Sequence, residues 1–171
     1  MTLVIDYLRL RRAVGLLGVL LPFVLLALAG EQPSLSAYYY TPARDVFVGL
    51  LFVIAALLGA YRGYDRGDRI CSALAAVALV LVALAPVGGA WHWLHLGAAL
   101  AFFLAVAELC RRFSFGGYRP RTFKALAGVI VAAVVAAAVG APLLLAESVA
   151  VVAFGVAWLV KGRAIEALVG P

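Results

Sequence analysis

The sequence predicts an all-α fold, a polytopic bundle of six membrane-spanning helices, and three observations support this prediction. Hydrophobic residues make up 67% of the 171 residues and charged residues only 13%, whereas a soluble domain is about half apolar and a quarter charged. The apolar stretches are continuous, without the two-residue alternation of a membrane β-barrel. Several of them approach the roughly 20 residues that a helix needs to cross a bilayer. These features exclude a water-soluble domain, a disordered chain and a nucleic-acid-binding module.

Six apolar stretches, separated by short connectors, are predicted to span the membrane. The connectors are rich in Gly, Pro, Arg and Tyr, and none is long enough to form a separate domain. Residues 1–171 are therefore expected to form a single domain. The sixth stretch is short, and Lys161 at its end is expected to extend toward the membrane interface. The predicted spans are Ala13–Gly30, Asp45–Tyr61, Cys71–Val87, His92–Cys110, Phe123–Leu145 and Ser148–Val160.

The distribution of Lys and Arg predicts the orientation. All of these residues except Arg44 flank the spans on the side where the first span begins. Basic residues are enriched in cytoplasmic loops, so both termini of a bacterial inner-membrane protein are expected in the cytoplasm, and the net charge of +6 reflects topology. An alternative for the first stretch is a cleaved signal peptide, because the small residues Ala27, Ala29 and Gly30 follow its apolar run. Cleavage would leave five spans.

The interior of the predicted bundle is uncharged, and this disfavours proton-coupled transport through a buried carboxylate. Glu108 is the deepest charge, and Arg112, four residues later, is its predicted ion-pair partner. Small residues recur every four positions in the fifth span, and such a stripe lets helix backbones approach closely. Packing within the bundle is the favoured interpretation, and a homo-oligomer through the stripe is the alternative. The stripe consists of Gly128, Ala132, Ala136 and Gly140, and further close contacts are predicted at Gly15, Gly18, Gly49 and Gly59.

Several polar residues lie on the side away from the arginine clusters. Both histidines, His92 and His95, open the fourth span three positions apart, so they share one helix face. Asp45 and Glu147 stand at the starts of the second and sixth spans. Two histidines and a carboxylate can bind zinc and leave a position open for water. We therefore expect a candidate zinc site at His92, His95 and Asp45, with Glu147 as a further candidate catalytic residue.

Two other interpretations of the same residues remain open. In one, a histidine beside a carboxylate acts as general base for a nucleophilic Ser34 or Ser36. In the other, the carboxylates are ordinary residues of a structural cap, because the helix dipole favours an anion in the first turn. The loop before the second span also offers hydrogen-bonding groups for a lipid headgroup. Its candidate ligand-binding residues are Glu31, Ser34, Ser36, Tyr38, Tyr39, Tyr40 and Arg44.

Two segments carry a family resemblance. Ser34–Gly49 (SLSAYYYTPARDVFVG), continuing to Tyr61–Asp65 (YRGYD), resembles a family of bacterial six-transmembrane-helix proteins without an assigned activity, and so does Ala153–Gly162. The first loop, with its Ser and Pro residues, and His95-Leu-Gly-Ala98 are distantly similar to the six-span DRAM autophagy modulators and the Sfk and PGAP-type lipid-remodelling proteins. This resemblance implies lipid or GPI-type lipid handling.

The sequence thus predicts an integral inner-membrane protein with a polar cup that faces the periplasm. Its expected role is the binding of lipid headgroups or the organisation of the membrane. The alternative is a membrane-embedded hydrolase or lipid-modifying enzyme, and the sequence does not decide between them. Membrane lipids are the expected partners, nucleic acid is not expected, and zinc is the one candidate cofactor.

Overall fold

The computed structural model describes residues 7–163, and within them every regular element is a helix. The predicted all-α fold is therefore confirmed. In this part of the chain there are six α-helices: α1 (Tyr7–Ala29), α2 (Arg44–Ala60), α3 (Arg66–Leu84), α4 (His92–Phe113), α5 (Pro120–Ala138) and α6 (Leu143–Lys161). Three short 3-10 helices lie in the connections: η1 (Ser36–Tyr40), η2 (Gly89–Trp91) and η3 (Ser114–Gly116).

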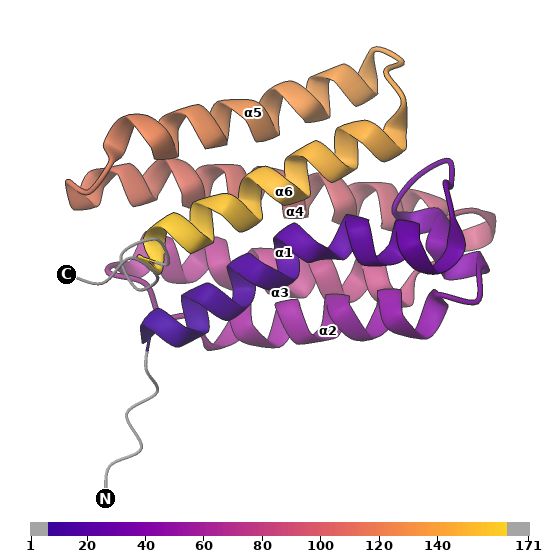
Figure 1. Cartoon of the computed structure of the whole chain (residues 1–171), viewed down its shortest axis with the longest axis horizontal. Helices are drawn as coiled ribbons and strands as arrows, with labels where there is room; N and C mark the ends of the chain where they lie inside the picture. The colour runs from indigo at the N-terminus through magenta and orange to yellow at the C-terminus, as the bar shows by residue number, and fades with distance from the viewer. Residues whose placement is uncertain (1–6, 164–171) are drawn as a thin grey trace, which may run out of the picture.

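The six α-helices form an antiparallel bundle. Each helix packs against its neighbours in sequence, and α6 closes the ring by packing against α1 (Figure 1). Helix α4 also contacts α6 across the bundle. The first residues of α1 and the last residues of α6 therefore lie at the same end (Figure 1).

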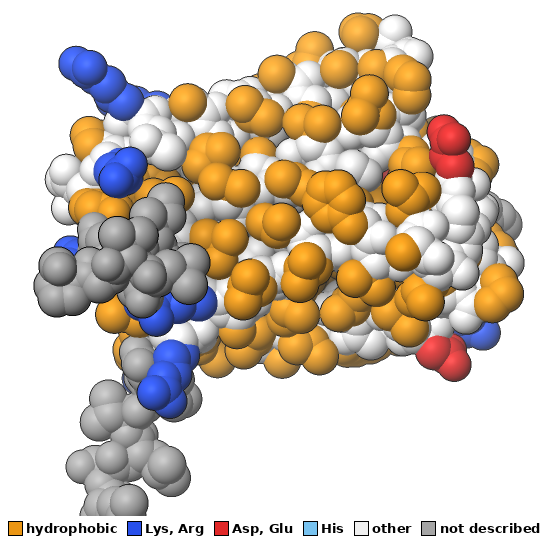
Figure 2. Space-filling view, viewed as in Figure 1, with side chains coloured by type: hydrophobic (Ala, Val, Ile, Leu, Met, Phe, Trp, Pro, Cys, Tyr) orange, Lys and Arg blue, Asp and Glu red, His pale blue; other side chains and the backbone are white. Residues whose placement is uncertain are grey.

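The outer surface between the two ends is apolar. Five helices are long and apolar enough to cross a membrane, namely all except α2, which has 17 residues. Hydrophobic side chains cover the visible face along the length of the bundle, and charged side chains gather at its ends (Figure 2). Exposed apolar residues such as Phe23, Leu74, Val77 and Val135 are costly in water and favourable in lipid. The prediction of several helices that are long and apolar enough to span a membrane is confirmed for these five.

Most Lys and Arg residues lie at one end of the bundle (Figure 2). This end carries the N-termini of α1, α3 and α5 and the C-termini of α2, α4 and α6, and we call it the basic end. The opposite end carries η1 and η2, and we call it the η1 end. Arg44, in the first turn of α2, is the one basic residue of the described chain at the η1 end.

The boundary between the last two helices lies earlier than predicted, so the spans Phe123–Leu145 and Ser148–Val160 were wrong at this junction. Gly140 has a positive φ of 98°, a conformation that glycine adopts readily. Pro142 directly precedes α6. This position suits proline, because it has no N–H to donate to a helical hydrogen bond. Apolar residues continue through this turn, so hydropathy does not locate it. Consequently α6 has 19 residues, and Glu147 lies inside the helix.

Helices α1 and α6 cross at glycines. A Cβ atom added to Gly155 would lie 2.6 Å from the backbone nitrogen of Val19 and 2.7 Å from the carbonyl oxygen of Gly15. A Cβ on Gly18 would lie 3.1 Å from the Cα of Gly155. The predicted close contacts at Gly15 and Gly18 are confirmed. The one predicted at Gly49 was wrong, since nothing lies within 4 Å of a Cβ built there.

The small-residue stripe of the fifth span does not pack within the bundle. A Cβ on Gly128 or Gly140 would meet nothing within 4 Å, and Ala132 is exposed. The interpretation as packing within the bundle was therefore wrong, because α5 turns another face inward and Gly140 lies beyond its end. A homo-oligomer through the stripe stays a prediction. The buried face of α5 consists of Phe123, Ala127, Ile130 and Ala133.

Candidate functional site

A largely apolar cavity of about 450 Å³ lies toward the η1 end, between α4, α5 and α6. Ligand pockets commonly have volumes of roughly 300–1,000 Å³. Several apolar side chains that line it are themselves exposed, so the cavity opens on the lateral surface of the bundle. These exposed residues are Leu96, Leu100, Ala138 and Leu143. Four polar side chains also line the cavity: Ser34, Ser36, His95 and Glu147.

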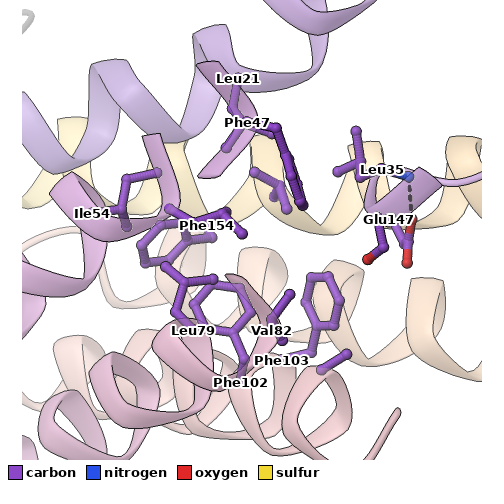
Figure 3. Close-up of a pocket in the computed structure, with 14 residues that line it drawn as sticks. Leu21, Leu35, Phe47, Ile54, Leu79, Val82, Phe102, Phe103, Glu147 and Phe154 are labelled. Atoms are coloured by element: carbon purple, nitrogen blue, oxygen red, sulfur yellow. Dashed lines mark hydrogen bonds between the residues drawn. The ribbon is translucent and has the colours of Figure 1, made fainter. Parts of the chain in front are cut away.

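A smaller cavity of about 50 Å³ lies deeper in the bundle (Figure 3). Its walls are mostly apolar and include the rings of Phe47, Phe102 and Phe154. Ser36 and Glu147 line both cavities. These two polar residues therefore stand where the larger lateral cavity approaches the apolar core.

His95 is held by two hydrogen bonds at this position. The residue is only 3% exposed. Its Nδ1 lies 2.6 Å from the carbonyl oxygen of Ala85, and its Nε2 lies 2.9 Å from the Oγ of Ser36. A carbonyl oxygen can only accept, so Nδ1 is the donor, and in the neutral ring Nε2 accepts from the Ser36 hydroxyl. The structure thus brings His95 and Ser36 together, which is one of the histidine–serine pairs that the nucleophile hypothesis allows.

Glu147 attaches the segment before η1 to α6. Its Oε2 accepts a 2.6 Å hydrogen bond from the backbone N–H of Leu35 (Figure 3). Within residues 7–163 no ion pair involves this carboxylate. The bond fixes Leu35 and therefore the position of Ser36, the next residue. Glu147 was predicted as a catalytic candidate, and the geometry places it beside Ser36 as an anchor of the backbone.

The tyrosines of the first loop hold the η1 end together. Tyr38 is buried and donates to the carbonyl oxygen of Gly30 over 2.7 Å, and its burial raises the pKa of the phenol. Tyr40 reaches across to the connection between α3 and α4, where its hydroxyl donates to the carbonyl oxygen of Val87 over 2.5 Å. The hydroxyls of both predicted ligand-binding tyrosines therefore donate to backbone carbonyls at the η1 end.

The other predicted ligand-binding residues differ in their contacts and in the cavity that they line. The guanidinium of Arg44 lies 4.4 Å from the ring centroid of Tyr39 and donates to its hydroxyl over 2.8 Å. The Oγ of Ser34 accepts from the backbone N–H of Ala37 over 3.1 Å, and Ser34 also lines the lateral cavity. Glu31 is exposed and lines a different, apolar groove. Of the predicted set, Ser34 and Ser36 line the lateral cavity.

The structure does not bring the predicted zinc ligands together. The ring of His92 packs edge-on against Trp93 with centroids 5.4 Å apart, whereas both nitrogens of His95 are already hydrogen-bonded. Asp45 is exposed in the first turn of α2. The two histidines share a helix face, but only His95, one turn deeper, reaches the interior. Among the described residues no three His, Cys, Asp or Glu side chains are grouped to hold a metal ion.

The sequence analysis missed an ion-pair cluster at the basic end. Arg112 donates from Nε to Asp68 over 2.8 Å and from Nη2 to both carboxylate oxygens of Asp65 over 2.5 Å. The predicted pairing of Arg112 with Glu108 is a minor contact of 3.9 Å, because Glu108 accepts two hydrogen bonds of 2.6 and 2.7 Å from Arg111. The N–H of Asp68, which Asp65 caps, and the guanidinium of Arg112 lower the pKa of Asp65. The capping spacing of the two aspartates is the signal that could have indicated this site.

Lys161 also differs from its prediction. It is buried, and its Nζ lies 4.7 Å from the ring centroid of Tyr64 and 4.8 Å from that of Phe113. Arg11 lies over the same Tyr64 ring, 5.3 Å from its centroid. Aromatic faces attract cations, so the ammonium group stays under these rings and does not extend freely into the interface.

The fold defines an all-helical protein with a laterally open cavity and, in the described residues, five helices that are long and apolar enough to cross a membrane. No known protein family, curated protein or solved structure matches this chain. The resemblance to lipid-remodelling proteins therefore stays a prediction, and the function is inferred from the geometry of the cavity.

Proposed function

We propose that this protein is an integral membrane protein that binds a neutral, chain-bearing lipid in the cavity between α4, α5 and α6. One observation carries the proposal: an apolar, laterally open cavity of about 450 Å³ has four hydrogen-bonding side chains in its lining. Apolar walls suit an acyl chain, and a few placed polar groups suit a headgroup. The four side chains are Ser34, Ser36, His95 and Glu147.

The chemistry of the lining favours a neutral headgroup. No Lys or Arg is among the described residues that line the cavity, and phosphate groups are typically bound by such cations. The oxygen of Ser34 accepts from the N–H of Ala37, so its hydroxyl can donate. The hydroxyl of Ser36 donates to His95, so its oxygen can accept, as can the carboxylate of Glu147. Hydroxyl and ester groups, as in a monoacylglycerol, fit these partners. Because the cavity opens on the lateral surface, such a lipid can enter from the bilayer without crossing water.

We further propose six spans, with the basic end in the cytoplasm of a bacterial inner membrane and the η1 end in the periplasm. Basic residues favour the cytoplasmic side, and α2 packs in the ring between α1 and α3, although its 17 residues give a length of only about 26 Å. A fluorescent protein fused to the C-terminus is expected to fluoresce, as it does when it folds in the cytoplasm. Activity of a C-terminal alkaline phosphatase fusion, which requires the periplasm, would contradict this orientation.

The binding proposal is tested by filling the cavity. Ala137 lines it on α5, whereas Ala132 lies on the exposed face of the same helix and does not line it. The protein in nanodiscs is irradiated with a monoacylglycerol that carries a diazirine in its chain. We expect Ala137→Trp to lower the labelling yield at least fivefold, because the indole occupies the space of the chain, and Ala132→Trp to leave the yield unchanged.

Two further results bear on this experiment. Both variants should elute from a sizing column like the wild type, so that a lower yield reports the cavity. A fatty acid with the same diazirine chain should label more weakly, because its carboxylate would face Glu147. Equal labelling of the wild type and Ala137→Trp would show that the probe attaches elsewhere and would contradict the proposal.

A further inference from the structure

We propose that the protein is also a serine acyl-transfer enzyme, in which Ser36 is the nucleophile and His95 the general base. The proposal rests on the lipid binding inferred above, because the lateral cavity would hold the acyl chain of the substrate. The substrate class is a carboxylic ester of a long apolar chain. The acceptor is water or the hydroxyl group of a second molecule.

The hydrogen bonds of His95 give the direction of proton transfer. The carbonyl oxygen of Ala85 accepts from Nδ1–H at 2.6 Å and so fixes the proton on that nitrogen. The free lone pair of Nε2 then faces the Ser36 hydroxyl at 2.9 Å, which is within the reach of about 2.6–3.2 Å that a general base requires. In serine hydrolases a carboxylate orients the histidine in this tautomer. Here a backbone carbonyl takes that position.

The surroundings hold the nucleophile in place and exclude bulk water. Ser36 is only 6% exposed, yet it lines both cavities. Glu147 fixes the preceding residue through the N–H of Leu35 and is a positioning residue. Ser36 is the first residue of η1, so its own N–H has no partner within that helix. In serine hydrolases the backbone N–H of the nucleophile donates to the developing oxyanion, and we assign this role to the N–H of Ser36.

The reaction balances with these groups alone. The Ser36 oxygen attacks the ester carbonyl carbon, and its proton passes to Nε2 of His95. The tetrahedral intermediate collapses, the bond from the carbonyl carbon to the alkoxy oxygen breaks, and the leaving alcohol takes the proton from Nε2. The acyl group is then an ester of Ser36. Water or an acceptor hydroxyl attacks this ester and gives its proton to Nε2, Nε2 passes that proton to the Ser36 oxygen as it leaves, and the acid or the new ester is released.

An alkyl fluorophosphonate with a hexadecyl chain tests the inference. An activated serine oxygen forms a bond to phosphorus and displaces fluoride, and the adduct is located by peptide mass spectrometry. We expect an adduct on Ser36 in the wild-type protein and in Ser148→Ala, a control outside the lateral cavity. Ser36→Ala is expected to abolish labelling, and His95→Gln to slow it at least 100-fold.

The outcomes separate this inference from the proposed lipid binding. His95→Gln and Ser36→Ala should elute from a sizing column like the wild type, which shows that they fold, and the diazirine monoacylglycerol measures binding by the wild-type protein. No adduct on Ser36 in a wild-type protein that binds this probe would overturn the acyl-transfer role and leave the binding role standing. An adduct on Ser34, or a labelling rate that His95→Gln does not change, would also overturn it.

Discussion

Replacement of Arg112 by alanine is expected to lower the free energy of unfolding by up to roughly 3–5 kcal/mol, the usual cost of leaving a buried charge without its ion-pair partner. Asp68 is only 4% exposed, and the loss of Arg112 leaves its carboxylate buried without the 2.8 Å partner. The Asp68 Oδ2 would keep only the N–H of Tyr64 at 3.0 Å. The midpoint of thermal unfolding in detergent measures the effect.

The neighbouring Arg111 provides a matched control. Its ion pair with Glu108 is solvent-exposed on both sides, and exposed pairs contribute about 0.2–1 kcal/mol. We expect Arg111→Ala to change the midpoint little. Arg112→Lys should not restore stability, because an ammonium group cannot bind both aspartates through a planar fork. Equal shifts for Arg111→Ala and Arg112→Ala would show that the cluster is not a major source of stability.

Replacement of Gly155 by alanine is expected to destabilise the crossing of α1 and α6. The new Cβ would approach the backbone nitrogen of Val19 to 2.6 Å and the carbonyl oxygen of Gly15 to 2.7 Å. Both are backbone atoms, so the helices must move apart, and overpacking of this kind typically costs about 1–3 kcal/mol. The same thermal unfolding assay detects the loss, and Gly155→Leu should lower the yield of folded protein further.

Gly128→Ala is the control for this substitution. It lies within α5 in the same membrane environment, and nothing lies within 4 Å of its added Cβ. Alanine favours a helix over glycine by up to about 1 kcal/mol, so this variant should unfold at the same or a higher temperature. If Gly155→Ala is as stable as Gly128→Ala, the glycine contact does not hold the two helices together.

The fold could be predicted from the sequence because its main determinant is local. Continuous apolar runs require helices in lipid, and the Lys and Arg residues, apart from Arg44, fall in every second connection, which places them at one end of an antiparallel bundle. The turn at Gly140 was missed because the residues around it are as apolar as the helices. The orientation of the stripe at Gly128 was also missed, since spacing shows that small residues share a face but not which face the bundle covers.

The candidate site could be predicted in part. Its residues are far apart in sequence, and only packing shows which of them meet. His95 and Ser36 are 59 positions apart, yet the sequence grouped them because both fall at the same membrane side. The sequence could not distinguish His95 from His92, because the two differ in depth by a single turn. The sequence did not pair Arg112 with Asp65, because these residues are 47 positions apart and Glu108 is the nearer carboxylate in the sequence.

The central claim is that a neutral lipid occupies the cavity between α4, α5 and α6, and the location of the photo-label tests it most directly. Wild-type protein labelled in nanodiscs with the diazirine monoacylglycerol is digested, and the modified residues are identified by mass spectrometry. We expect the label on residues that line the cavity, with Leu96, Leu100 and Val134 prominent. Label spread over the exposed apolar surfaces of α1 and α3, for example at Phe23, Leu74 and Val77, would contradict the claim.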